Sequence, residues 1–179
     1  PQEAATGVTP TDGAPIAGKS GSGSVFPHNG EFVRVRTDIA IGSAFGPSFA
    51  FTRTFRSQVD YIGELGNGWD HSLNARLIWR FEDTDEDGTD ELFLDYYDGT
   101  GRRDPFELKT DSEGGYYFES PVGVYLKLKS AGGGMYELID GSGTRMYFTR
   151  YDVPETFLLS GIEDRHGNRL DVLRSVDGK

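Results

Sequence analysis

The chain has 179 residues, a length that suits one domain with a real hydrophobic core. Its formal net charge of −11 and the scattered placement of Lys and Arg argue against nucleic-acid binding. The sequence has no Cys, which excludes disulfides and thiolate metal sites, and no apolar run long enough to predict a membrane span. Aromatics at 13% together with 25 Gly favour short strands joined by tight turns.

The first 24 residues are dominated by small residues, Gly, Pro and Thr, so they are predicted to be a flexible linker or lead-in. Residues 25–179 are predicted to form one β-rich domain. From Phe32 onward the apolar pattern has a period of two, which predicts a strand. Its predicted apolar face is formed by Val33, Val35, Ile39 and Ile41.

A second predicted strand carries Phe51, Arg53 and Phe55 on one face. A guanidinium that faces inward between two aromatic rings needs a partner, because an unpaired buried charge costs several kcal/mol. We therefore expect Arg53 to pair with Asp38 or Asp70. The alternative, a functional anion site at Arg53, has less support.

The turn Gly66-Asn67-Gly68 precedes Trp69, which is expected to be a packing anchor because glycine lets backbone approach its ring. The clearest predicted strand follows this turn. Its apolar residues alternate with polar ones from Leu73 to Phe81.

The second half is punctuated by glycine turns at intervals of about ten residues, which predicts successive hairpins. A further apolar face is predicted from Val122 to Leu128, and Gly132-Gly133-Gly134 is expected to reverse the chain. The predicted fold class is therefore all-β, an antiparallel meander of short twisted strands with little helix. Periodicity alone leaves open whether it closes as a sandwich, a partial barrel or an open sheet.

The segment from Asp83 to Glu91 has the oxygen-rich spacing of a calcium loop. Asp83, Asp85 and Asp87 take positions 1, 3 and 5, Thr89 takes position 7 through its carbonyl, and Glu91 takes position 9. The bidentate glutamate of an EF-hand is replaced by Leu94, so the pattern predicts a calcium loop set between strands. The alternative is an acidic, solvated hairpin tip that discourages edge-to-edge association.

Two stretches of the sequence carry distinctive motifs. The first contains Arg53 and Phe55 within Phe51-Thr52-Arg53-Thr54-Phe55-Arg56-Ser57, and then Gly68-Trp69. The second is Asp164-Arg165-His166-Gly167-Asn168, a predicted hairpin turn in which Gly167 and Asn168 are expected to supply positive φ angles. Together, these two stretches resemble the opening domain of bacterial Rhs/YD-repeat proteins. Asp177-Gly178-Lys179 is similar to the lead-in to a following repeat of that class.

This resemblance implies a non-catalytic structural domain at the start of a β-shell used in secretion, toxin delivery or cell-surface interaction. It implies a secreted or cell-surface location in bacteria, and as partners the downstream repeat region of the same polypeptide and its cargo. A component of such a shell would expose a strand edge or apolar face, through which the excised domain can associate with itself.

Two other functions remain as alternatives. One is a free-standing, calcium-dependent extracellular module that binds a carbohydrate or protein partner through an aromatic groove near the acidic loop. The other, less favoured, is a hydrolase. The three histidines, His28, His71 and His166, have no partners at informative spacing, and no nucleophile motif is present, so no enzyme activity is predicted.

Overall fold

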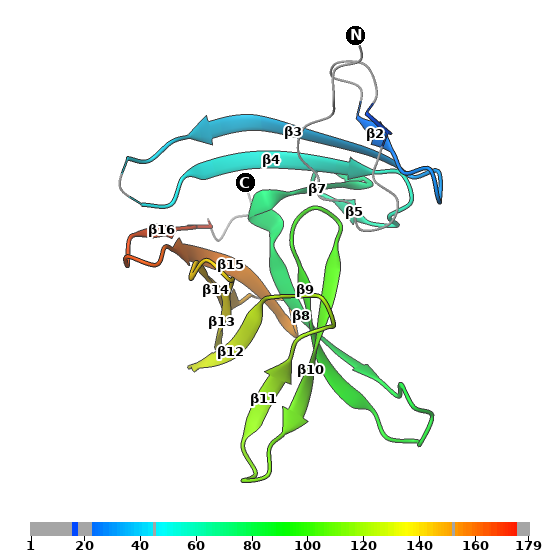
Figure 1. Cartoon of the computed structure of the whole chain (residues 1–179), viewed down its shortest axis with the longest axis vertical. Coiled ribbons are helices and arrows are strands. Elements are labelled where there is room, and N and C mark those ends of the chain that lie inside the picture. Colours follow the sequence, from blue (N-terminus) through cyan, green and yellow to red (C-terminus); the bar gives the residue numbers. More distant parts are fainter. Residues whose placement is uncertain (1–15, 18–22, 45, 152, 175–179) are drawn as a thin grey trace.

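The computed structural model describes residues 16–17, 23–44, 46–151 and 153–174. Nearly all of its regular structure is antiparallel β, which confirms the predicted fold class (Figure 1). Within these residues the helical structure is a single 3₁₀ turn, η1 (Ser72–Asn74). The predicted linker, residues 1–24, lies largely outside the described residues, as does the lead-in Asp177-Gly178-Lys179.

The N-terminal strands form a sheet, here the arm sheet, with the order β1-β2-β3-β4-β7 among the described residues. Its strands are β1 (Ile16–Ala17), β2 (Ser24–Val25), β3 (Phe32–Ile41), β4 (Phe49–Arg56) and β7 (Trp69–His71). The short strands β5 (Ile62–Gly63) and β6 (Gly66–Asn67) pair separately. The long ribbon of β3 and β4, here the arm, extends over the rest of the molecule (Figure 1).

The apolar face predicted for β3 is wrong, because the strand contains a β-bulge at Asp38. Thr37 pairs with Thr52 and Ile39 with Phe51, so the extra residue reverses the alternation. Ile39 therefore shares a face with Phe51 and Arg53, whereas Val33 and Val35 lie on the opposite face. An alternation of apolar residues that is counted without the bulge therefore assigns residues from both faces of β3 to a single face.

The remaining strands form a second sheet, here the curled sheet, with the order β11-β10-β9-β8-β15-β14-β13-β12 and β16 paired to β15 among the described residues. The sheet curls until it is nearly closed and barrel-like (Figure 1). Its strands are β8 (Arg76–Glu82), β9 (Glu91–Tyr97), β10 (Arg103–Thr110), β11 (Tyr116–Glu119), β12 (Lys127–Gly132), β13 (Met135–Ile139), β14 (Arg145–Arg150), β15 (Thr156–Glu163) and β16 (Arg169–Asp171).

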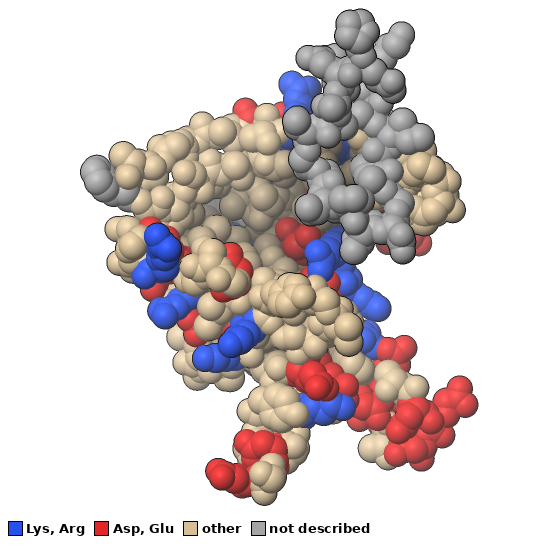
Figure 2. Space-filling model, viewed as in Figure 1, with Lys and Arg blue, Asp and Glu red and all other residues tan. Residues whose placement is uncertain are grey.

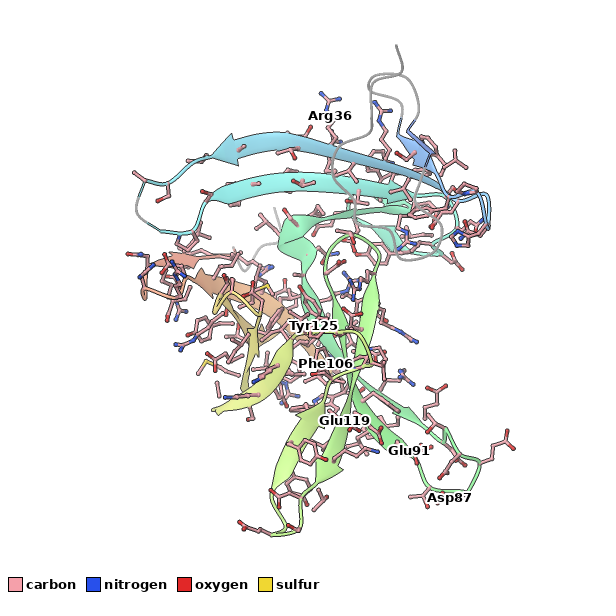
Figure 3. The ribbon with its side chains drawn as sticks, in the orientation of Figure 1. Arg36, Asp87, Glu91, Phe106, Glu119 and Tyr125 are labelled. Atoms are coloured by element: carbon pink, nitrogen blue, oxygen red, sulfur yellow. The ribbon has the colours of Figure 1, made fainter. Side chains whose placement is uncertain are left out.

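The hydrophobic core fills the inside of the curled sheet (Figure 3, where Phe106 marks it). One alternate set of side chains from each strand points inward, as the period-two pattern predicts for a sheet with one covered face. The fully buried core side chains are Leu77, Leu94, Phe106, Leu138 and Phe148.

Two strand predictions differ from the structure. The strand expected from Leu73 begins at Arg76, because residues 72–74 form η1 before the chain enters the curled sheet. The strand expected from Val122 to Leu128 begins only at Lys127, because residues 120–126 connect β11 to β12. Leu128 is in the core and Val124 and Leu126 pack against it, so three residues of the predicted apolar face are correct, whereas Val122 is fully exposed.

A buried ion pair joins the two sheets. Asp70 on β7 accepts hydrogen bonds from the Asn74 side-chain amide (2.7 Å) and the Arg76 guanidinium (3.3 Å). The Arg76 guanidinium lies over the rings of Tyr61 and Tyr97, 4.8 and 4.6 Å from their centroids. Because Asp70 and Arg76 are only 4% and 8% exposed, each depends on the other for compensation of its charge.

The substitution Asp70→Ala is expected to destabilise the protein by about 3–5 kcal/mol, since it leaves the Arg76 guanidinium buried without a carboxylate. The matched control, Asp171→Ala, removes the exposed partner of Arg169 and is expected to cost less than about 1 kcal/mol. Urea unfolding followed by tryptophan fluorescence measures both. Equal losses in the two variants would contradict a special role for the Asp70–Arg76 pair.

Candidate functional site

The acidic loop, residues 83–90, joins β8 to β9 at a projecting tip (Figures 2 and 3). Carboxylate oxygens of Asp83, Asp85 and Glu91 come within 4.8 Å of one another. These are three of the five residues that the sequence predicts as calcium ligands, and their oxygen atoms are of the kind that calcium prefers. The loop thus gathers hard ligands at one point.

The other two predicted ligands are placed differently. Asp87 Oδ1 accepts a hydrogen bond from the Thr89 N–H (2.7 Å), and the Asp87 N–H donates to Asp83 Oδ1 (3.1 Å) and Asp85 Oδ1 (3.2 Å). Asp87 and Thr89 therefore shape the turn. Hydrogen bonds from the N–H and hydroxyl of Thr84 lower the pKa of Glu91 and keep its charge near the cluster. The calcium site itself stays a prediction.

The first motif is assembled on one face of the arm sheet. Arg53 donates from Nε and Nη2 to the two oxygens of Asp38, one of the two partners expected from the sequence. Its guanidinium carbon lies 5.5 Å from the centroid of the Trp69 ring. That ring packs against Phe55 at an interplanar angle of 49°, with the centroids 5.3 Å apart. Arg53 is partly exposed rather than enclosed between aromatic rings, with 31% of its side chain accessible.

Gly68 permits this packing because its backbone lies in the left-handed region, with φ +71°. A Cβ at this position would be 2.7 Å from the Arg56 carbonyl oxygen and 3.0 Å from the Phe55 ring. Only glycine satisfies both constraints. The sequence Gly68-Trp69 therefore encodes a close approach of β4 to the turn before β7.

The second motif is a hairpin turn, as predicted. Asp164 Oδ1 accepts hydrogen bonds from the N–H groups of His166 (2.8 Å) and Asn168 (3.0 Å). The Gly167 N–H donates to the Asp164 carbonyl (3.1 Å), with φ +83° at Gly167. The expected positive φ occurs at Gly167 alone and not at Asn168. Arg165 is exposed and donates to His166.

The same turn chemistry recurs along the curled sheet. An aspartate accepts a hydrogen bond from the N–H two residues later, and a glycine three residues later has a φ between +80° and +88°. Within the described part of the chain these pairs are Asp85 and Gly88, Asp98 and Gly101, Asp111 and Gly114, Asp140 and Gly143, and Asp164 and Gly167. The glycine-turn recurrence visible in the sequence therefore has a shared structural basis.

Two surface features were not predicted from the sequence. A hollow of about 430 Å³, here the arm hollow, lies between the arm and the C-terminal end, and is lined by Ile41, Phe49, Leu73, Leu170, Val172 and Leu173 with Ser43, Pro47 and Asp171. A groove of about 530 Å³, here the aromatic groove, is lined by Trp79, Leu108, Tyr116, Tyr117, Phe118, Leu128, Lys129, Ser130 and Tyr136. The sequence shows the apolar and aromatic residues of these segments, but not that they are exposed. Only the tertiary structure brings the strands that carry them together.

Comparison with known families gives one finding. Residues 23–106 match the family model described as a domain of unknown function (DUF6531). The match covers a little under half of the chain, from β2 into β10, and so includes the Arg53 and Trp69 motif and the acidic loop. No curated protein matches the chain.

The described residues contain no helix with the length and apolar character needed to span a bilayer.

Calcium is expected to order the acidic loop, because bound cation offsets repulsion between its carboxylates. Amide hydrogen exchange across residues 83–91 should slow in about 1 mM calcium relative to chelator. The double substitution Asp83→Asn and Asp85→Asn should abolish this difference, whereas Glu113→Gln at the β10–β11 turn should leave it unchanged. Identical exchange with and without calcium in the unsubstituted protein would rule out the site.

The Asp164 turn is expected to give pH-dependent stability. The side-chain amide of Asn168, with the N–H groups of Asn168 and His166, lowers the pKa of Asp164 against a smaller effect of desolvation. A lowered folded-state pKa means that the contribution is present above the ordinary value of 3.8 and is lost as the pH falls through the folded value.

We therefore expect Asp164→Asn to be less stable than the unsubstituted protein near about pH 7, with the difference shrinking towards about pH 2. Urea midpoints measured across this range test the expectation. A difference that is independent of pH would show that the charge of Asp164 does not stabilise the turn.

Proposed function

We propose that this chain is a non-catalytic structural domain at the start of an Rhs/YD-repeat β-shell protein. Its role is to begin a larger β-structure rather than to carry out chemistry. The motif residues that resemble this class lie where β4 pairs with β7 in the arm sheet, and in the turn between β15 and β16 of the curled sheet, and both groups stabilise strand pairing. The recurrent aspartate and glycine turns support the proposal, because a repeat built from such hairpins continues the same local geometry.

The arm hollow is the observation that carries the proposal. Above it, Ile39 and Ile41 on the arm are 52% and 61% exposed, and below it Leu173 is 91% exposed. Figure 2 shows the surface hollowed beneath the arm. Clustered, exposed aliphatic side chains mark a surface that another segment covers, since leaving them in water forgoes about 25 cal/mol per Å² of burial.

The location of the arm hollow supports a following segment of the same polypeptide as the one that covers it. Val172 and Leu173, two of the last described residues, form part of its lining. The edge of β3 beyond Val33 has no strand partner among the described residues, since β2 pairs only with Phe32 and Val33. Strands that follow this chain in a longer polypeptide would fill the hollow and pair with an open edge, so the downstream repeat region is the proposed partner.

The resemblance to Rhs/YD-repeat proteins adds a location and a role to this proposal. The domain would belong to a secreted or cell-surface bacterial protein whose shell holds or presents a cargo. In the absence of the following strands, the same exposed arm gives the excised domain a surface for self-association.

Cysteine labelling tests the proposal, because the sequence contains no Cys of its own. Ile41→Cys reports on the arm hollow, and Val122→Cys, in the exposed β11–β12 connection, is the matched control. The reaction of each with a maleimide is compared in this chain and in a version extended by the downstream coding sequence of its gene.

The expected result is that extension slows labelling of Ile41→Cys at least about tenfold and leaves Val122→Cys unchanged. Sedimentation analysis of the unextended chain checks whether self-association covers the site instead. Equal labelling of Ile41→Cys in the monomeric short and long chains, or a downstream sequence without tandem repeats, would overturn the proposal.

The second candidate function is a calcium-dependent extracellular module that binds a carbohydrate or protein. The convergence of Asp83, Asp85 and Glu91 favours it, as does the aromatic groove elsewhere on the curled sheet. This function requires calcium to alter ligand binding, whereas the structural role does not. Ligand affinity measured with calcium and with chelator separates the two candidates.

A further inference from the structure

The curled sheet stays open between its two end strands. β11 pairs only with β10 and β12 only with β13 among the described residues, so each strand has one free edge. At the narrow end the Ser120 hydroxyl donates to the Leu126 carbonyl (2.5 Å). From there β11 and β12 diverge (Figure 1), and the aromatic groove lies between them. The curled sheet is therefore not closed, because β11 and β12 do not pair with each other.

Both edges direct unpaired backbone groups into this opening. The Asp111 N–H donates to the Gly115 carbonyl (2.8 Å), and hydrogen-bonded pairs alternate along an antiparallel ladder. In β11 the residues bonded to β10 are therefore Tyr117 and Glu119, so Tyr116 and Phe118 direct their N–H and C=O groups outward.

The same alternation applies to β12. The Asp140 N–H donates to the Thr144 carbonyl (3.0 Å), so Leu138, two residues earlier, has its backbone groups hydrogen-bonded to β14. The backbone groups of Glu137 therefore point the other way, to Lys129 on β12. Leu128 and Ser130 consequently direct their backbone groups into the opening. A strand placed there has hydrogen-bonding partners on both sides.

The floor of the aromatic groove is apolar and partly open to solvent. Trp79, Phe118 and Tyr136 contact one another at ring-centroid distances of 5.9 to 6.3 Å. Tyr116 and Tyr117 at its rim are 76% and 47% exposed. Such a cluster provides a pocket for the inward side chains of an added strand.

Charge distinguishes the outward face of this opening. Lys127 and Lys129 flank buried Leu128 on β12, are exposed, and make no ion pair with any described residue. Lys129 lies opposite Glu137 on β13, but Glu137 pairs with Arg145 (3.3 Å), so among the described residues the two lysines keep a local basic site on the β12 side of the opening. On the β11 side the outward, exposed Glu119 is acidic, so the lysines attract an acidic strand from the β12 side only. Acidic side chains on the outward positions of an incoming strand would lie beside them.

We propose that the opening between β11 and β12 binds an extended peptide segment of another polypeptide by β-augmentation. The segment has apolar residues at alternate positions, facing Trp79, Phe118 and Tyr136, and acidic residues at the intervening positions, beside Lys127 and Lys129. The four residues of β11 and six of β12 limit the paired length to a short segment. This inference does not depend on the proposed shell role.

The test uses a synthetic peptide, acetyl-Gly-Glu-Val-Glu-Leu-Glu-Val-Gly-amide, titrated into the ¹⁵N-labelled chain at physiological salt. Amide resonances of β11 and β12 are expected to shift, and the amides of Phe118 and Ser130 to become protected from exchange. The substitutions Lys127→Glu and Lys129→Glu together are expected to weaken binding at least tenfold and to favour a peptide in which each Glu is replaced by Lys.

The matched control carries Arg150→Glu and Arg165→Glu, two exposed positions away from the groove that change the net charge equally. It is expected to bind the acidic peptide like the unsubstituted chain. Absence of binding at millimolar peptide, binding that is equally weakened in both double variants, or shifts confined to residues outside β11, β12 and the lining of the aromatic groove would overturn the proposal. So would a neutral oligosaccharide that shifts the groove resonances when the peptide does not, since that would assign the groove to carbohydrate.

Discussion

The architecture depends on one buried ion pair, Asp70–Arg76, at the place where the chain leaves the arm sheet and enters the curled sheet. Asp70 is the centre of β7 and Arg76 is the first residue of β8, with only η1 between them. Both charges are removed from water, so the pair is satisfied only when the two sheets meet in one orientation. A second contact supports it: Arg56 binds buried Glu31 and also donates to the Gly101 carbonyl in the β9–β10 turn.

This junction explains why burial is so uneven. Around it the arm sheet is packed, and Thr54, Gly68 and Asp70 are buried. Farther along the arm, β3 and β4 have no strand partner but each other among the residues that the structure describes, and their aliphatic side chains remain exposed. The curled sheet shows the same contrast, with a closed interior and an open boundary between β11 and β12. Each sheet therefore has a stable centre and an unsatisfied edge, and both proposals concern these edges.

The charged side chains follow the same division between packed centres and exposed edges. Carboxylates concentrate at the tips of the projecting hairpins (Figure 2), where repulsion is screened by solvent and where it disfavours edge pairing. Within the structure, carboxylates have specific tasks: Asp38 occupies the bulge and binds Arg53, Asp95 binds Arg80, and the turn aspartates accept backbone N–H groups. Lys127 and Lys129 depart from this pattern, since neither forms an ion pair with another described residue, although Lys129 lies opposite Glu137 on β13.

The sequence by itself determined the fold class, most turns and the local motifs, because these follow from short-range chemistry. Period-two alternation identified the inward face of β8, and the glycine triplet and aspartate-glycine pairs identified hairpins. The need to compensate the charge of Arg53 limited its expected partner to Asp38 or Asp70, and the structure shows Asp38. The convergence of Asp83, Asp85 and Glu91 was likewise visible in their spacing.

Only the tertiary structure decided the rest. The bulge at Asp38 places Ile39 and Ile41 on the opposite face of β3 from Val33 and Val35. A bulge cannot be predicted from the spacing of apolar residues, because it is defined by the pairing with a partner strand. The curl, the arm hollow and the aromatic groove arise from strands far apart in sequence, whose pairing depends on how the whole sheet twists. The exposure of Val122 also depends on the tertiary structure. The alternation of apolar residues predicts which side chains share a face, but not whether another element covers that face.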